Sequence, residues 1–199
     1  MEVIVFHHAL GLTRGVVEFA DVLRRRGHVV HTPDLYAGRT FASLIDGVAY
    51  AQSVGFGEIL ARGASAVNQL SCDVVYAGFS LGVMPAQMLA QTRAGARGAL
   101  LFHGCVPVSE FGDRWPAGVP VQIHAMERDP FFVNDGDLDA ARALVKESPD
   151  AALFLYDGDL HLFADSSLES YDATAANSLV RRVVAFLEVC GSRPKPQRS

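Results

Sequence analysis

A serine between two glycines, in the stretch GFSLG from Gly78 to Gly82, could act as a nucleophile. The stretch fits the GxSxG pattern, in which a strained strand-to-helix turn exposes a serine hydroxyl. An apolar run at 74–77 precedes it and a longer apolar segment follows it, so both the strand and the helix are predicted. Because the first amides of a helix have no partner inside that helix, the N–H of Leu81 is predicted to stabilise the oxyanion that forms when Ser80 attacks a carbonyl.

A serine nucleophile also needs a general base within hydrogen-bond reach. Where a GxSxG turn is used, the order along the chain is serine, then an acid, then histidine. Four of the seven histidines precede Ser80, and no acidic residue lies between the turn and His103. His124 lies inside a predicted strand and is expected to pack in the core. His161, in a loop after a strand, is therefore the predicted base.

The residue that orients the base is predicted to be Asp129, which comes just after the strand 121–126 and before a proline. Open α/β sheets build their sites at the carboxyl ends of strands, which favours this position. Glu127 and Asp135 are alternatives, because the order along the chain does not separate the three acids.

Two further parts of a site follow from the same pattern. The second oxyanion amide should come from the loop after the first strand, and we predict that Ala9 supplies it. An apolar acyl pocket could be lined by aromatic side chains, although packing in the core or a loop is the more common role for each of them. The candidates for the pocket are His8, Phe79, Phe131, Phe132, Phe163 and Trp115.

Strands and helices alternate along the chain, which predicts an α/β fold with a mostly parallel, doubly wound sheet of about six strands. Strands are expected at 3–7, 28–32, 73–77, 99–103, 121–126 and 152–156. Helices are expected at 13–26, 57–70, 83–92, 137–146 and 171–189, and 40–54 is expected to be a helical or irregular excursion across the sheet edge. We predict one domain over 1–191 and a frayed polar tail over 192–199.

Composition and the absence of certain motifs exclude several classes of function. A net charge of −5 and a pI near 5.8 argue against nucleic-acid binding. Three cysteines without a CxxC pair indicate reduced thiols, and no signal peptide or membrane-spanning run is apparent, so a cytoplasmic location is expected. Nucleotide-binding glycine motifs are absent from the sequence, and the acidic run 134–139 lacks the spacing of a calcium loop. We therefore expect no cofactor and no metal.

Four motifs together resemble the dienelactone hydrolase family of α/β-hydrolases, and the resemblance spans nearly the whole chain. They are PDLY at 33–36, GFSLG at 78–82, Asp129 and HLF at 161–163. The resemblance implies a small hydrolase without a cofactor or a large cap domain. It also implies the roles of the individual residues: Ser80 as nucleophile, His161 as base and then acid, Asp129 as its orienting partner, and the amides of Leu81 and Ala9 as the oxyanion hole.

The sequence departs from that family at three positions. The founding members carry a cysteine where Ser80 stands. Their oxyanion loop holds a glutamate that contacts the nucleophile, and the matching position here is His8. They bind the substrate carboxylate with arginines, one of them at the position of Asp165, and a like charge there is expected to repel a carboxylate. Arg39 is expected to be a solvated loop residue.

The sequence therefore predicts an enzyme that cleaves a small ester, lactone or thioester through an acyl group on Ser80. Two alternatives stay open at this point. The chain could be a binding module that keeps a hydrolase scaffold, or an acyltransferase, because an acyl-enzyme serves both hydrolysis and transfer. A monomer is favoured, and no membrane partner is expected.

Overall fold

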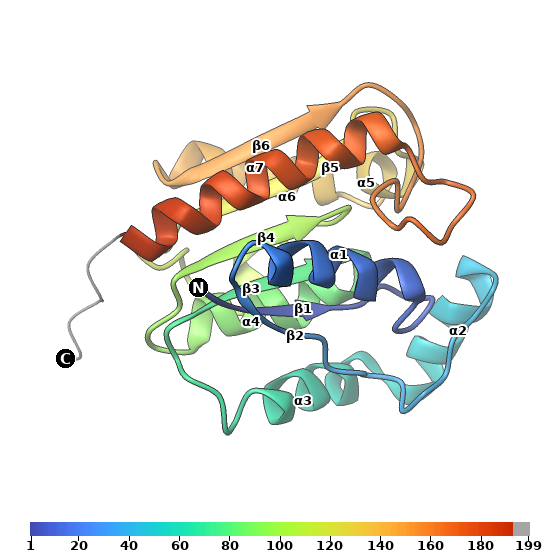
Figure 1. Ribbon diagram of the computed structural model, residues 1–199, viewed down its shortest axis with the longest axis horizontal. Coiled ribbons are helices and arrows are strands. Elements are labelled where there is room, and N and C mark those ends of the chain that lie inside the picture. Colours follow the sequence, from blue (N-terminus) through green and yellow to red (C-terminus); the bar gives the residue numbers. More distant parts are fainter. Residues whose placement is uncertain (193–199) are drawn as a thin grey trace.

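Six parallel strands form one sheet in the order β2-β1-β3-β4-β5-β6 in the computed structural model, which describes residues 1–192 (Figure 1). The strands are β1 (Glu2–Phe6), β2 (Val29–His31), β3 (Val74–Phe79), β4 (Gly98–Phe102), β5 (Val121–Met126) and β6 (Ala151–Tyr156). The helices are α1 (Arg14–Arg25), α2 (Leu44–Val54), α3 (Phe56–Ala66), α4 (Val83–Thr92), α5 (Pro130–Asn134), α6 (Asp137–Glu147) and α7 (Ala173–Ser192). This arrangement confirms the predicted α/β fold.

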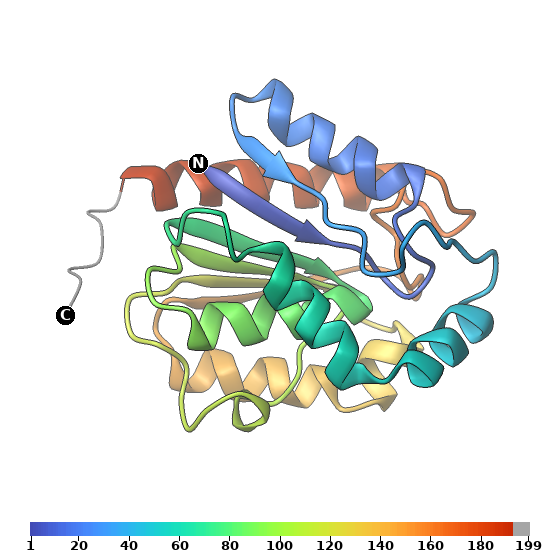
Figure 2. The ribbon, with the colours of Figure 1, turned by 90° about the horizontal axis from the view of Figure 1, so that it is seen from below.

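Helices cover both faces of the sheet (Figure 2). α1 and α7 lie on one face, and α3, α4 and α6 lie on the other. Each face carries its own apolar cluster, and every residue of β3 is buried. A strand that is covered on both faces has a continuous apolar sequence, and such runs made the strands predictable from the sequence.

Local sequence signals explain how α1 begins, which face it packs on the sheet and where it ends. The Thr13 side chain accepts a hydrogen bond from the N–H of Val16 and so caps α1. The buried residues Val16, Phe19, Ala20 and Leu23 recur at helical spacing and face the sheet. Gly27, with φ of 84°, turns the chain back toward β2.

The segment 40–54 is more regular than expected. Ser43 caps α2 by accepting the N–H of Ile45, and the helix lies beyond the carboxyl ends of the strands (Figure 2). A Cβ at Gly47 would lie 2.1 Å from the carbonyl oxygen of Ala9, so this glycine lets α2 approach the loop after β1. α2 is thereby placed against the loop predicted to supply an oxyanion amide.

The closing helix α7 extends to Ser192, whereas the prediction ended at residue 189. Residues 193–199, most of the predicted polar tail, lie outside the described residues. Within residues 1–192, no helix combines the length and apolar character needed to cross a bilayer.

Candidate active site

The turn after β3 holds Ser80 in a strained conformation with φ of 47°. A Cβ at Gly78 would lie 2.0 Å from the carbonyl oxygen of Gly82, and a Cβ at Gly82 would lie 2.5 Å from the carbonyl oxygen of Phe6. Both positions therefore require glycine, because a side chain would collide with backbone. The tight packing fixes the bend that presents the Ser80 hydroxyl at the carboxyl end of the sheet.

Three predicted residues form one hydrogen-bonded series. The Ser80 Oγ lies 3.0 Å from His161 Nε2, and His161 Nδ1 lies 2.6 Å from Asp129 Oδ2. Because a carboxylate only accepts, Nδ1 carries the proton and Nε2 is left to accept from the serine hydroxyl. The Asp129 side chain is fully buried. This geometry is the one that general-base activation of a serine requires.

Asp129, and not either alternative acid, contacts the histidine. Its second oxygen accepts the N–H of Phe131 at 3.0 Å and caps α5, a short helix that the sequence analysis missed. The cap holds the carboxylate in place. Glu127 instead pairs with Arg128 at the surface.

The loop after β1 is held by its two histidines. His7 Nδ1 donates to the carbonyl of His8 at 2.8 Å, and His7 Nε2 accepts the N–H of Leu35 at 2.9 Å. Burial lowers the pKa of His7 to about 4, so it stays neutral in this role. Ala9, which follows His8, lines the same cleft as Leu81. These are the two residues whose N–H groups were expected to form the oxyanion hole.

The expectation that His8 lines the substrate pocket is wrong. His8 Nδ1 accepts the N–H of Leu10 at 3.2 Å, so its Nε2 carries the proton and donates to Asp165 Oδ2 at 2.8 Å. The ring is fully buried and lies edge-on to Phe79. His8 therefore ties the loop after β1 to the loop after His161.

Phe79 was also predicted to line the pocket, and this too is wrong. Side chains alternate across a strand, and Phe79 shares with Val75 and Ala77 the face of β3 that packs under α1 and α7. Its ring contacts Phe19 edge-on, with centroids 5.1 Å apart. Other aromatic candidates are likewise buried in the core: Phe132, Phe163 and Trp115.

Asp165 does not repel substrate as predicted, because it is fully buried and does not line the cleft. Its carboxylate accepts hydrogen bonds from His8 Nε2, the Thr13 hydroxyl at 2.5 Å, and both the N–H and the hydroxyl of Ser167. Burial opposes its ionisation, but these hydrogen bonds outweigh burial and lower the pKa of Asp165 to about 2.

Asp165→Asn is expected to lower the free energy of unfolding at pH 7 by about 2 kcal/mol, because an amide nitrogen would face donors. A depressed pKa stabilises the fold above the unfolded value near 4, and this contribution is lost as the pH falls toward 2. Denaturant titrations at several pH values should therefore show a smaller acid dependence in the variant. Asp139→Asn, at an exposed position, is the control, and equal stability of both variants would contradict this role for Asp165.

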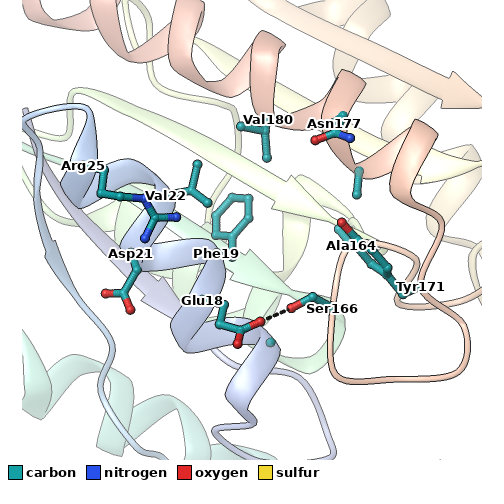
Figure 3. Close-up of a pocket in the computed structure, with 12 residues that line it drawn as sticks. Glu18, Phe19, Asp21, Val22, Arg25, Ala164, Ser166, Tyr171, Asn177 and Val180 are labelled. Atoms are coloured by element: carbon teal, nitrogen blue, oxygen red, sulfur yellow. Dashed lines mark hydrogen bonds between the residues drawn. The ribbon is translucent and has the colours of Figure 1, made fainter.

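The loop from His161 to α7 is also attached to α1. Figure 3 shows the Glu18 carboxylate accepting a hydrogen bond from the Ser166 hydroxyl, at 2.6 Å, beside a cavity of about 380 Å³ between α1 and α7. None of the three hydrogen-bonded residues Ser80, His161 and Asp129 lines this cavity. These contacts restrain the segment that positions His161.

A smaller cleft, of about 180 Å³, opens directly onto the Ser80 hydroxyl. Phe131 lines it, as predicted, and its ring lies against His161 with centroids 4.7 Å apart. The lining residues are Ala9, Val48, Ala51, Phe56, Ser80, Leu81, His103, Phe131, Asp135, Asp137 and His161. Among residues 1–192, no group of three or more His, Cys, Asp or Glu side chains is placed to hold a metal ion.

Two polar residues of the cleft, His103 and Asp137, were not assigned to the site from the sequence. His103, just after β4, is 2% exposed, and no described residue hydrogen-bonds to either of its ring nitrogens. Burial keeps its pKa well below the usual value, so the ring is neutral. Asp137 accepts the N–H of Cys105 at 3.0 Å, and burial raises its pKa to about 6. For His103, its position directly after β4 was the available signal, whereas Asp137 begins α6 and no strand end points to it.

Comparisons with known proteins show the family and the fold. Residues 1–190 match the dienelactone hydrolase family. A structure named m3DLH is 23% identical, with a TM-score of 0.77, over 94% of this chain and 86% of that one. The dienelactone hydrolase-like promiscuous phosphotriesterase P91, from metagenomic libraries, is 23% identical, with a TM-score of 0.70, over 94% and 85%.

More distant structures share the fold. Esterase 2 of Thermogutta terrifontis in its apo form is 16% identical, with a TM-score of 0.66, and the match covers 98% of this chain and 85% of that one. Among curated proteins, the sequence has no significant match.

Proposed function

Because this chain belongs to the dienelactone hydrolase family, we propose that it hydrolyses small carboxylic esters, lactones or thioesters through an acyl group on Ser80. The observation that carries the proposal is the hydrogen-bonded series from Asp129 through His161 to the Ser80 hydroxyl. The series ends in a cleft that is also lined by Leu81 and Ala9.

In the acylation step, Ser80 Oγ attacks the carbonyl carbon while its proton passes to His161 Nε2. The negative charge that develops on the carbonyl oxygen is stabilised by the N–H groups of Leu81 and Ala9. When the carbonyl re-forms, the bond to the leaving group breaks and His161 gives the proton to the leaving oxygen or sulfur. Asp129 stabilises the transient imidazolium and fixes its orientation.

In the deacylation step, a water molecule takes the place of the leaving group. His161 accepts one of its protons while the oxygen attacks the acyl carbon, and the same two amides stabilise the second oxyanion. Collapse returns the proton to Ser80 Oγ and releases the carboxylic acid. Every proton is exchanged between substrate, water and residues of this chain, so no cofactor enters these steps.

The dimensions of the cleft favour a small substrate. Its volume of about 180 Å³ lies below the several hundred Å³ usual for sites that enclose drug-sized ligands. Much of the lining is apolar, with Val48, Ala51 and Phe56 contributed by α2 and α3. We therefore expect short acyl groups to be cleaved faster than long ones.

An organophosphonate with a fluoride leaving group, directed at activated serines, tests the proposal. We expect one adduct per chain, on the peptide that contains Ser80, and loss of p-nitrophenyl acetate hydrolysis in proportion to labelling. The reason is that a serine hydroxyl is a good nucleophile at neutral pH only when it is hydrogen-bonded to a general base. Labelling spread over several serines, or hydrolysis that survives complete labelling of Ser80, would argue against the acyl-enzyme.

A further inference from the structure

We propose that the cleft selects substrates by charge, so that esters with a cationic group near the ester are preferred and esters with a carboxylate there are rejected. This inference rests on the proposed ester hydrolysis at Ser80. It names the substrate class of that site, which the family name does not give.

The charge of the cleft comes from the junction between α5 and α6. Asp135 and Asp137 both line the cleft, and Asp137 lies within electrostatic range of Asp135 and His161. Asp135 is exposed and Asp137 is half-buried. Two carboxylates therefore flank the route by which a substrate reaches Ser80.

No basic side chain in the described lining offsets these carboxylates, because the cleft contains neither lysine nor arginine. Arg39, which was expected to be a solvated loop residue, stacks over the Tyr50 ring at 5.4 Å from its centroid and does not line the cleft. A bound carboxylate would thus lose water without gaining a cationic partner, and it would face two like charges.

His103 gives a second, independent indication. Its ring forms part of the cleft wall beside His161, and neither ring nitrogen has a hydrogen-bond partner among the described residues. The buried ring is neutral. The histidine beside His161 therefore supplies no positive charge with which a substrate carboxylate could pair.

Aromatic rings supply the complementary surface for a cation. Phe131 is 47% exposed and Phe56 is 41% exposed, although both line the cleft. An ammonium group can bind over the face of such a ring, and nearby carboxylates strengthen the attraction. With the ester carbonyl at Ser80, a cationic alcohol portion would lie between Phe131 and Asp135.

Three thioacetates with the same acyl group test the inference: acetylthiocholine, its neutral isostere 3,3-dimethylbutyl thioacetate, and the anionic S-acetyl-3-mercaptopropionate. The released thiol is measured at pH 8 and low salt. We expect kcat/KM to be about tenfold higher for the cation than for the neutral isostere, and about tenfold lower for the anion. Raising the salt concentration to 0.5 M, on the order of several times the physiological value, should bring the kcat/KM of the cation and that of the anion closer to the value of the neutral isostere.

The double variant Asp135→Asn with Asp137→Asn should bring the three kcat/KM values to within about threefold of one another. The ratio cancels any general effect on catalysis. Asp139→Asn removes the same charge from α6 outside the cleft and should leave the ratios unchanged.

Three results would overturn the inference. Equal kcat/KM values for the three thioacetates in the wild type, or unchanged ratios in the double variant, would refute charge selection while the proposed hydrolysis stands. No hydrolysis of any of the three would refute both proposals together.

Discussion

Replacing Ser80 with alanine is expected to lower kcat for p-nitrophenyl acetate by a factor on the order of 10⁶, leaving only the residual acceleration that binding and the oxyanion amides supply. The variant keeps the cleft and the two amides but has no oxygen to form the acyl-enzyme. Folding should be preserved, because within residues 1–192 the Ser80 Oγ hydrogen-bonds to His161 alone. Initial rates at neutral pH, together with circular dichroism, measure the two properties separately.

Ser71→Ala is the matched control. Ser71 is exposed and lies before the start of β3, at the opposite end of the strand from Ser80. Its substitution should leave kcat unchanged. If Ser80→Ala retained more than about a hundredth of the wild-type rate, the hydrolysis would have to proceed without the acyl-enzyme, and a direct attack by water would replace it.

The parts of the site that were predictable from sequence are those set by local geometry. A GxSxG turn requires glycine at two fixed positions, and Gly78 and Gly82 meet backbone carbonyls closely enough to explain both. The order of residues along the chain then excluded five of the seven histidines, and the position of His124 inside a strand left His161. Parallel strands bring their carboxyl ends to one edge, so residues far apart in the sequence could be expected together.

Side-chain partners across the fold could not be predicted in this way. The sequence offered three acids for one histidine, and the cap that Asp129 provides for α5 decides which one faces it. His8 and Asp165 are separated by 157 positions, and nothing in either local motif indicates that they bond to each other. Phe79 was misplaced because the strand continues to Phe79 itself, two residues beyond its predicted end.

The charged wall of the cleft illustrates the same limit. Asp137 was expected only as the first residue of the helix 137–146, yet its carboxylate reaches across to the N–H of Cys105 while Gly136 takes the cap position. Like-charge repulsion was expected from Asp165, which the structure buries. Asp135 and Asp137 line the cleft instead, so the carboxylates that face a substrate are theirs and not that of Asp165.

His161→Ala is expected to reduce kcat nearly as much as Ser80→Ala, again by a factor on the order of 10⁶, because residues of such a series act as a unit. Without the imidazole, the serine hydroxyl keeps its proton and the leaving group receives none. Combining both substitutions should therefore cost little more than either one alone. Measuring kcat for the two single variants and the double variant, under the conditions used for Ser80→Ala, gives this comparison.

The variant His124→Ala is the control that distinguishes the catalytic role of His161 from the structural role of a buried histidine. His124 hydrogen-bonds to Tyr156 and Gln122 and stacks on Phe154, and burial lowers its pKa to about 3. Its loss should destabilise the fold by about 2 kcal/mol or more while the folded fraction keeps its activity. His161→Ala should show the reverse pattern. Equal rates for His161→Ala and the wild type would remove the histidine from the mechanism, and with it the function assigned to Asp129.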